Sequence, residues 1–519
     1  MANLLIQGGT VVDGSGKARL VADVRVRGSR ISEIGTLEAA DKERVLDAKG
    51  MFVTPGFVDI HCRSDAYATL FTIPTQDSLV RQGVTTIVIG NSGSSLAPLV
   101  RADQLASIQK WSDITAFSVN WRSMGEFFTE LARHPLGVNI ATLVGHGMVR
   151  RGILGNEERP LTDEELQELL FMVEAAIDEG AFGVSLGLSY AHARGATTQE
   201  LSAIMELAHS KKALVAASLR DEAKGFLDSF KELYSLAKDT EVNMEFSHLK
   251  VQGEPFWGNY EGALSMLADE GVPSVHFDIY PYATTSSVLY SFFPAWASEG
   301  GNAGLIATLR DSQTRAKLIK ELEASAYDFS SMVVSMGMLP ASHIGQSIGA
   351  LAKRQGIGVV EMALQLIEAS HNQVVVLVKA MSKENTRRAM QHPRGFVTTS
   401  AAGFSAQKHN GMPHPRSFGA FARFLRLCRE DAILPWEEAV HKITLGPASK
   451  VGLVQRGKIA EDWFADIVVW DPESIADKAT FEDPYHYPVG MKYGIVNGEL
   501  AFSPEQEGII CAGKPIKKQ

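Results

Sequence analysis

The stretch Gly56-Phe-Val-Asp-Ile-His61-Cys-Arg63-Ser-Asp65 predicts a buried apolar strand that ends in polar side chains. Its pattern is close to His-x-His, with which a barrel strand can bring two imidazoles to one zinc ion. The second position is Arg63 instead. An arginine has no lone pair to donate, and its fixed charge opposes a cation placed beside it. The stretch therefore predicts a barrel strand whose metal-binding end is altered.

Further apolar runs follow this stretch along the chain, and each predicts a buried strand. They lie at 85–90, 139–145, 180–186, 213–219, 242–249, 273–280 and 395–400. Amphipathic helical stretches lie between most of them, for example 162–179 and 198–211. Eight strands that alternate with helices predict a (β/α)8 barrel. The predicted fold class is therefore α/β, with a TIM-like barrel.

The two ends of the chain differ from this middle part. Residues 1–55 contain short apolar runs separated by glycine-rich turns, and residues 455–519 show the same pattern. We therefore expect one small β-sandwich domain formed by both ends, next to a barrel over 56–454. The stretch at about 286–373 contains helical segments and is too long for a plain loop, so we expect an insertion over the barrel mouth.

Composition limits the classes of partner. The chain has 519 residues, of which 45% are hydrophobic, and a formal net charge of −10, which argues against nucleic acid or an anionic membrane as partner. No signal peptide and no run of the roughly 18 apolar residues of a membrane span is found. The widely spaced Cys62, Cys428 and Cys511 do not form a disulfide framework. We expect a cytoplasmic protein; whether it forms a homo-oligomer stays open.

The active site of such a barrel lies at the carboxyl ends of its strands, and these ends supply the candidate residues. In strand order they are His61 and Arg63, Ser92, His146, Tyr190, Ser218, His248 and Lys250, and Tyr282. By the alternation of a strand, His61 and Arg63 share one face of their strand, and His248 and Lys250 likewise share a face of theirs. The last predicted strand ends in Thr399-Ser-Ala-Ala-Gly403, which has no carboxylate.

Several motifs, taken in order, resemble the D-aminoacylase (N-acyl-D-amino-acid deacylase) branch of the amidohydrolase superfamily over nearly the whole chain. They are Thr54-Pro-Gly-Phe-Val-Asp-Ile-His61, Gln82-Gly-Val-Thr-Thr, Gly145-His-Gly-Met-Val-Arg150, Arg220-Asp-Glu, Ser247-His-Leu-Lys250, Tyr280-Pro-Tyr, His414-Pro-Arg416 and Ala465-Asp-Ile-Val-Val-Trp-Asp-Pro. The resemblance implies a barrel enzyme that uses zinc to hydrolyse an acylated amino acid.

The metal ligands that the resemblance implies carry over poorly. The family has a second histidine where this chain has Arg63, a cysteine at Ser92 and a histidine at Ser218, whereas His61 and His248 are kept. The family's last strand ends in Ser-Asp-Gly, whose aspartate binds metal and acts as the base, and this carboxylate has no counterpart here. Catalytic zinc needs three protein ligands and an open position for water. We therefore assign no metal ligands and no cofactor.

The positions at which this chain keeps the residues of the family suggest a different chemistry at the same strand ends. By the resemblance, Tyr190 and Lys250 hold the carboxylate or acyl group of the substrate, and Arg416 lies in the His-Pro-Arg turn. Arg63 can bind a carboxylate bidentately or stabilise an oxyanion. We assign His248, Lys250, His61 and Tyr190 to acid–base catalysis. We assign Arg63, Tyr190, Lys250, Ser92, Ser218, His146, Tyr282 and Arg416 to substrate binding. Ser92 and Ser218 lack the Gly-x-Ser-x-Gly pattern of a nucleophile.

The sequence thus predicts a metal-independent enzyme that acts on a small, carboxylate-bearing amide or amino-acid-derived substrate. Acyl transfer, condensation, cyclisation and isomerisation all agree with the residues. Two alternatives stay open: a zinc-dependent N-acyl-D-amino-acid deacylase with unusual ligands, and a non-catalytic relative that binds a ligand.

Overall fold

The computed structural model describes residues 3–101, 104–105, 118–155, 157–268, 272, 274–407 and 411–519. Its centre consists of parallel strands in two sheets, with strand orders β10-β9-β8 and β11-β12-β13-β14-β15-β19. These strands are β8 (Phe57–Asp59), β9 (Val84–Ile89), β10 (Asn139–Thr142), β11 (Val144–Gly145), β12 (Gly183–Gly187), β13 (Leu214–Ser218), β14 (Asn243–Phe246), β15 (Val275–Ile279) and β19 (Gly395–Val397). They confirm the predicted strands; residue 273, the first of the seventh, lies outside the described residues.

The order of strands is the one that the predicted barrel requires. Only Leu143 separates β10 from β11, so these two form one interrupted strand. An isolated parallel bridge between Cys62 and Ala401 brings the residues after β8 beside those after β19. The Arg63 N–H donates to the Ala401 carbonyl at 2.9 Å across the same junction. The carboxyl ends of the first and last strands are therefore neighbours, although the hydrogen-bonded ladders form two sheets and not one closed ring.

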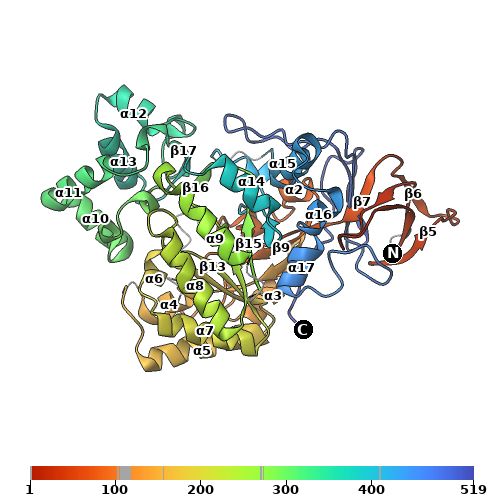
Figure 1. Ribbon diagram of the computed structural model, residues 1–519, viewed down its shortest axis with the longest axis horizontal. Coiled ribbons are helices and arrows are strands. Elements are labelled where there is room, and N and C mark those ends of the chain that lie inside the picture. The colour runs from red at the N-terminus through yellow and green to blue at the C-terminus, as the bar shows by residue number, and fades with distance from the viewer. Residues whose placement is uncertain are drawn as a thin grey trace.

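Helices cover the outside of these strands (Figure 1). They are α1 (Thr69–Thr72), α2 (Asp77–Val80), α3 (Met124–Leu131), α4 (His146–Leu154), α5 (Asp163–Asp178), α6 (Ala191–Arg194), α7 (Thr198–Ser210), α8 (Phe226–Thr240), α9 (Tyr260–Leu267), α14 (Lys383–Gln391), α15 (Arg416–Asp431), α16 (Trp436–His441) and α17 (Leu445–Val451). The sequence explains why α5 begins where it does: the Thr162 side chain accepts from the Glu165 N–H, and Glu165 caps Thr162 in return.

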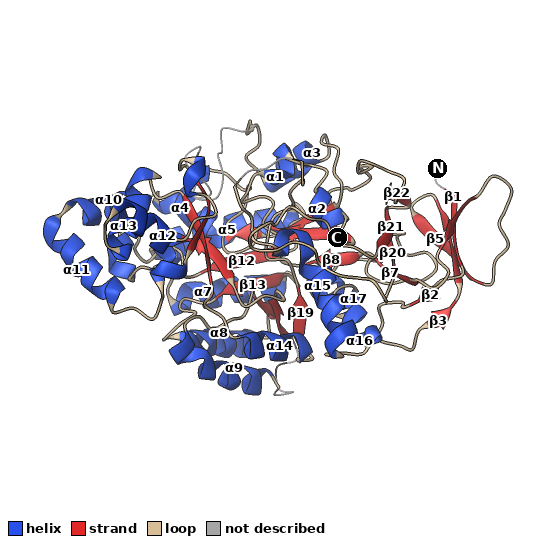
Figure 2. Cartoon of the chain, turned by 90° about the horizontal axis from the view of Figure 1, so that it is seen from above, coloured by secondary structure: helices blue, strands red, loops and turns tan. Residues whose placement is uncertain are grey.

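Strands from both ends of the chain share one sheet, as Figure 2 shows on the side of the N-terminus. Its order is β22-β21-β20-β7-β2-β3, and β20 pairs antiparallel with β7. These strands are β2 (Thr10–Val11), β3 (Leu20–Val21), β7 (Phe52–Pro55), β20 (Ile467–Trp470), β21 (Met491–Val496) and β22 (Glu499–Phe502). A second sheet contains β1 (Asn3–Gln7), β4 (Asp23–Arg27), β5 (Arg30–Gly35) and β6 (Arg44–Asp47). Apolar residues of both sheets form a common core.

The segment 285–378 forms a separate layer, and its helices lie at the left of Figure 1. It contains an antiparallel sheet of β16 (Thr285–Val288), β18 (Val374–Val378) and β17 (Val333–Gly337). Its helices are α10 (Gly301–Arg310), α11 (Ser312–Glu323), α12 (Ile348–Gln355) and α13 (Val359–Ala369). Leu289, Leu305, Leu351 and Ile367 belong to a hydrophobic cluster that is distinct from the central core. The segment therefore has its own packing.

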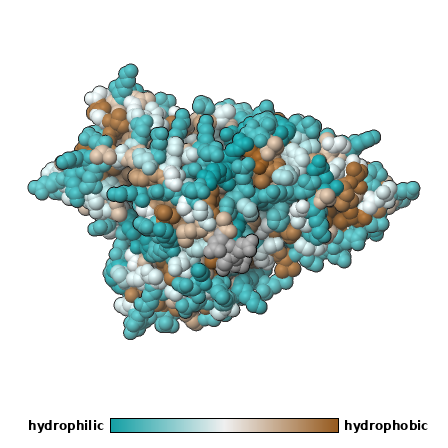
Figure 3. All heavy atoms as spheres, viewed as in Figure 1, coloured by the Kyte–Doolittle hydropathy of each residue, from teal (hydrophilic) through white to brown (hydrophobic). Residues whose placement is uncertain are grey.

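The outer surface is mostly polar on the face drawn in Figure 3, with apolar residues scattered among hydrophilic ones. Among the described residues, no helix combines the length and the apolar character that crossing a membrane would need.

Candidate active site

A cleft of about 570 Å³ lies where the predicted strand ends meet the segment 285–378. It is lined by Arg63, Tyr190, Ser218, His248, Lys250 and Arg416, all of which the sequence selects, and by Glu222, Tyr280 and Ser400, which it does not. A larger cavity of about 930 Å³ shares Tyr190 but none of the other selected residues. The smaller cleft is therefore the candidate site.

Lys250 connects two of the groups in the cleft wall. Its ammonium group donates to Glu222 Oε1 at 2.6 Å and to His248 Nδ1 at 2.9 Å. Burial and the neighbouring Lys250 charge lower the pKa of His248 to about 4. Burial alone would raise the pKa of Glu222, but Lys250 and His248 outweigh it and lower this pKa to about 2. At neutral pH, His248 is thus a neutral imidazole that accepts at Nδ1 and carries its proton on Nε2.

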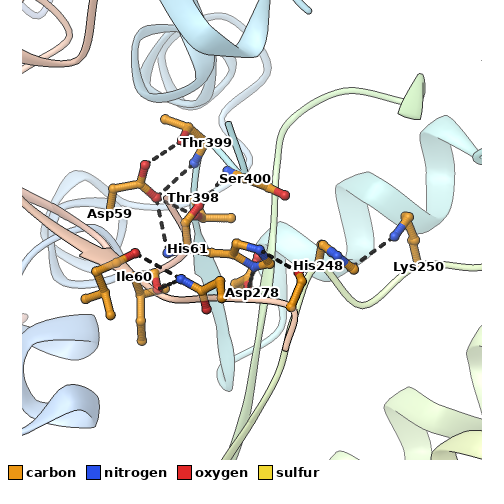
Figure 4. A network of polar contacts seen from close by, with 12 residues as sticks. Asp59, Ile60, His61, His248, Lys250, Asp278, Thr398, Thr399 and Ser400 are labelled. Carbon is orange, nitrogen blue, oxygen red and sulfur yellow. Dashed lines mark hydrogen bonds and ion pairs between the residues drawn. The ribbon is translucent and has the colours of Figure 1, made fainter. Parts of the chain in front are cut away.

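His61 lies directly behind this cluster, with its ring stacked on that of His248 at 4.9 Å between centroids. Its Nδ1 is 3.0 Å from Asp278 Oδ2, and its Nε2 is 3.5 Å from Ser92 Oγ. Figure 4 shows Asp278, His61, His248 and Lys250 as neighbours in one polar network. Because the carboxylate can only accept, Nδ1 carries the proton and Nε2 has a free lone pair.

A second buried carboxyl group, that of Glu245 on β14, lies next to Asp278. Glu245 and Asp278 interact through their carboxyl groups, and Glu245 Oε1 and Asp278 Oδ1 have no other hydrogen-bond partner among the described residues. Burial and the Asp278 charge raise the pKa of Glu245 well above its usual range. Burial would also raise the pKa of Asp278, but His61 outweighs it and lowers this pKa. Glu245 therefore donates its proton to an ionised Asp278.

The last strand is tied to the first by another buried carboxylate. The hydroxyl groups of Thr398 and Thr399 donate to Asp59, and the Thr399 N–H does so at 3.1 Å (Figure 4). Burial raises the pKa of Asp59 to about 6, although these hydrogen bonds oppose the shift. The contact holds the following residue, Ser400, in the cleft wall, where its Oγ has no partner among the described residues.

Two buried guanidinium groups face the cleft. Arg63 is hydrogen-bonded to Tyr190, and Arg416 lies over the Tyr280 ring with 4.3 Å between its Cζ and the ring centroid. Arg416 is 4% exposed, no described carboxylate lies within ion-pair distance of it, and its Nε has no partner there. Burial lowers the pKa of Arg416. A buried cation without a counter-ion is suited to bind an anion from solution.

Four residues that the sequence selects do not line the cleft: His61, Ser92, His146 and Tyr282. His146 is fully buried at the start of α4 and contacts Glu200 through Nε2 at 2.6 Å. Tyr282 packs on His414, with 5.0 Å between ring centroids, while Tyr280 takes the position in the cleft wall. Tyr280 comes directly after β15, whereas Pro281 interrupts the alternation before Tyr282. Ser92 is also behind the wall, next to His61.

Three functional candidates were missed: Glu222, Asp278 and Tyr280. Each lies at or just after a predicted strand, so its position was a usable signal. Their importance comes from partners far along the chain. Asp278, for example, contacts His61, which lies 217 positions before it in the sequence.

Replacing Glu200 with alanine is expected to lower the free energy of unfolding by about 3–5 kcal/mol, because it leaves a buried cation unpaired. Arg150 is fully buried and donates through Nε to Glu200 Oε1 at 2.8 Å. Urea denaturation measures the change. The control is Glu157→Ala, which removes an ion pair to Arg159 whose glutamate side chain is 65% exposed. It is expected to change stability by about 0.5 kcal/mol or less. Equal effects of the two variants would contradict a stabilising role of the buried cluster.

The described residues contain no group of three or more His, Cys, Asp and Glu side chains arranged to hold a metal ion. In the site, Lys250 donates to His248 Nδ1, which leaves the proton of this ring on Nε2, and Arg63 adds a positive charge. This donor set does not fit a catalytic zinc site, which needs three protein ligands.

Known proteins resemble the chain over its whole length. Residues 412–502 match the model of the amidohydrolase family. The chain is 30% identical to a D-aminoacylase of Alcaligenes xylosoxydans xylosoxydans over 517 residues, which cover 98% of this chain and 97% of that protein. It is 31% identical to an N-acyl-D-glutamate deacylase of the same organism over 505 residues, 96% of this chain and 93% of that one. The crystal structure of N-acyl-D-glutamate deacylase from Bordetella bronchiseptica, complexed with zinc and a phosphonate inhibitor, matches with a TM-score of 0.84 at 27% identity over 100% of both chains. The α/β fold is thus that of the D-aminoacylase structures.

Proposed function

The chain belongs to the D-aminoacylase-like amidohydrolases, and on that basis we propose that it acts without a metal ion on a small amide that carries a carboxylate. N-acylated D-amino acids are the class of substrate that the names of its relatives indicate. The observation that carries the proposal is Arg416, a buried guanidinium in the cleft that pairs with no carboxylate of the described residues. A carboxylate on the substrate would complete this pair.

Membership of the family supports two structural proposals as well. We infer that the two parallel sheets close into a (β/α)8 barrel, because the bridge between Cys62 and Ala401 joins their outer strands. We also infer that residues 1–55 and 455–519 form one composite β domain, with the segment 286–373 inserted into the barrel chain over 56–454. The pairing of β7 with β20 in one sheet supports the composite β domain. The separate hydrophobic core of the segment 286–373 supports its assignment as an insertion.

The metal that accompanies such a site in the Bordetella structure does not fit the residues of this chain. Two imidazoles and a nearby arginine give too few ligands and the wrong charge. Under the proposal, proton transfer falls to His61, His248, Lys250 and Tyr190. His61 Nε2 is the base, because its Nδ1 proton is held by Asp278.

The cations of the cleft have a distinct task in the proposed reaction. Arg416 and Arg63 hold the carboxylate of the substrate and place its amide near His248, behind which His61 is stacked. The Nε2–H of His248 and the Arg63 guanidinium can donate to the amide oxygen as negative charge develops there. Acyl transfer is the reaction that such a base and such donors serve best.

An assay of amine release tests the proposal directly. N-acetyl-D-glutamate, N-acetyl-D-aspartate and N-acetyl-D-leucine are offered to protein purified without added metal, beside the primary amide of each compound as a matched control. We expect turnover of a free acid but not of its amide, unchanged after treatment with a chelator and without stoichiometric zinc by elemental analysis.

Two results would contradict this expectation in different ways. Loss of turnover with the chelator and recovery with zinc would show a zinc-dependent deacylase. Binding of the acids by calorimetry without any turnover would show a ligand-binding relative that does not catalyse.

A further inference from the structure

We propose that the cavity of about 930 Å³ beside the cleft receives the far end of the substrate's acyl group, and that this end carries a carboxylate. The substrate class is then an N-acyl amino acid whose acyl group comes from a dicarboxylic acid. The inference rests on the proposed function, because it extends the substrate of that same site.

The cavity lies between the barrel helices and the segment 285–378. Its wall contains residues of α4 and α6 on one side, and residues of α10 and of the turn at 371–373 on the other. Pockets of roughly 300–1,000 Å³ hold drug-sized ligands, so the cleft of about 570 Å³ already has room for an N-acetyl amino acid. The cavity therefore offers space for a longer acyl group.

Tyr190 connects the cavity with the cleft, since it lines both. On the cleft side it is hydrogen-bonded to Arg63, one of the two cations that hold the substrate carboxylate in the proposed function. Arg194 also lines the cleft, and it donates at 3.4 Å to the Oγ of Ser298, which lines the cavity. Tyr190 and Arg194 are both only partly buried. An acyl chain that starts at the amide can thus enter the cavity along the Tyr190 ring.

Part of the cavity wall suits the methylene groups of such a chain. Tyr290 lines the cavity, is half-buried and packs with Tyr190 against the same small hydrophobic cluster. Ala191, Ile306 and Ala307 add further apolar surface. Each methylene group that such a wall removes from water raises the affinity about fourfold.

The charges of the cavity wall favour an anion at the end of the chain. Arg151 of α4 is 9% exposed, and Arg310 at the end of α10 forms no ion pair with a described carboxylate. Asp311 is the one acidic residue among the described lining residues, and its Oδ1 accepts from the Thr314 N–H at 2.8 Å at the start of α11. In a chain with a formal net charge of −10, this local excess of cations indicates an anionic ligand.

Asn372 adds a hydrogen-bonding group to the same wall. Its side chain is 9% exposed, and its Oδ1 has no hydrogen-bond partner among the described residues. Since no donor fixes Oδ1, a half-turn about the last bond of the side chain presents the two Nδ2–H donors instead. A carboxylate only accepts, so it can take one of these donors together with a guanidinium. A ligand carboxylate would thus satisfy a buried polar group that the folded chain leaves unpaired.

Titration calorimetry of the full-length protein with matched acyl groups tests the assignment. N-hexanoyl-D-leucine and N-adipoyl-D-leucine have acyl chains of equal length that end in a methyl group and in a carboxylate, respectively, and the N-octanoyl and N-suberoyl compounds form a longer pair. We expect the carboxylate member of at least one pair to bind about tenfold more tightly or better at low salt, with a smaller advantage at about 0.5 M salt. Equal affinities within both pairs would overturn the assignment.

A variant that fills the cavity shows where the chain binds. Ala303→Trp places a large ring in the cavity from the third residue of α10. The control is Ala350→Trp, because Ala350 is also exposed, is the third residue of α12 in the same segment, and lines neither space. We expect Ala303→Trp to remove the advantage of the longer acyl groups and to leave the affinity for N-acetyl-D-leucine unchanged. Equal weakening of the acetyl and adipoyl compounds would contradict the assignment.

A second variant tests the charge at the end of α10. Arg310→Glu is expected to weaken binding of N-adipoyl-D-leucine about tenfold or more and to leave N-hexanoyl-D-leucine unchanged. Arg354→Glu is the control, since Arg354 is an exposed arginine in the last turn of α12 and lines neither space. Equal effects of the two variants on the adipoyl compound would contradict a role of Arg310. Thermal denaturation shows that each variant is folded.

Failure of this assignment and failure of the proposed function are distinguishable. If the protein binds N-acetyl-D-leucine and gains nothing from the longer acids, the proposed function stands and the assignment of the cavity is wrong. If no N-acetyl amino acid binds, the proposed function is wrong, and monomethyl adipate then probes the cavity by itself. Binding of monomethyl adipate that is lost in Ala303→Trp and kept in Ala350→Trp would support the cavity site, and any other result would overturn it.

Discussion

Replacing Arg416 with methionine is expected to stabilise the free protein and to abolish its binding of a carboxylate ligand. Arg416 is 4% exposed and no described carboxylate pairs with it, so folding removes its charge from water without a negatively charged partner. Methionine fills a similar volume without a charge, and such replacements stabilise by about 1–3 kcal/mol. The ligand then loses its buried charge partner, which lowers affinity on the order of a hundredfold or more.

Thermal denaturation with and without N-acetyl-D-glutamate measures both effects, and titration calorimetry gives the affinity. Arg423→Met is the matched control, because Arg423 lies on the same helix α15 and over a tyrosine ring, that of Tyr282, at 4.6 Å. Arg423 pairs with Asp477 at 3.3 Å and does not line the cleft. This control should lose some stability and keep its affinity. An Arg416→Met protein that binds the ligand as tightly as the parent would remove the main support for the proposed function.

Replacing Glu222 with glutamine is expected to lower the free energy of unfolding at neutral pH by about 3 kcal/mol, because it breaks a largely buried ion pair. Glu222 accepts from Lys250 at 2.6 Å and from the Gln252 side chain at 2.6 Å, and its own side chain is 17% exposed. The change also frees Lys250 from its anchor beside His248, so we expect turnover to fall as well. Denaturation in urea, followed by the assay of amine release, measures both quantities.

The same variant predicts a difference in acid sensitivity. The pKa of Glu222 in the folded protein is about 2, below its ordinary value of 4.5. A carboxyl group with a lowered pKa contributes stability that is fully present above pH 4.5 and is lost as the pH falls toward 2. The parent should therefore lose stability over this range more steeply than Glu222→Gln. The control Glu174→Gln, at a side chain that is 46% exposed, should follow the parent. Parallel curves for parent and Glu222→Gln would contradict the shifted pKa.

Much of the fold could be predicted because strands and helices leave local signals. The run 162–179 carries both its apolar spacing and its cap, and the helix forms over Asp163–Asp178 with Thr162 as the capping residue. The strand β9, Val84–Ile89, is buried along its whole length, as its unbroken apolar and threonine run indicates. Such signals lie within a few residues of each other, so one sequence is enough to detect them.

The site could be predicted only in part, because its chemistry depends on which polar atoms are already engaged. Position on a strand end selected His61, His248 and Lys250, but it could not show that Glu222 holds Lys250 or that Glu245 donates to Asp278. His146 follows the same rule of position, yet its Nε2 is engaged by Glu200. Alternation gives the face of a residue, whereas its partners are set by packing between elements that lie far apart in the sequence.

The separate core of the segment 285–378 has a consequence for how this protein can change over evolutionary time. Arg63, Glu222 and Lys250 in the cleft follow the ends of parallel strands, while Phe292, Phe293 and Tyr327 in the cleft lining come from this segment. Because the segment packs on itself, substitutions there can reshape the space offered to an acyl chain without disturbing the strand ends. The range of substrates and the chemistry performed on them are thereby encoded in different stretches of the sequence, and selection can act on each alone.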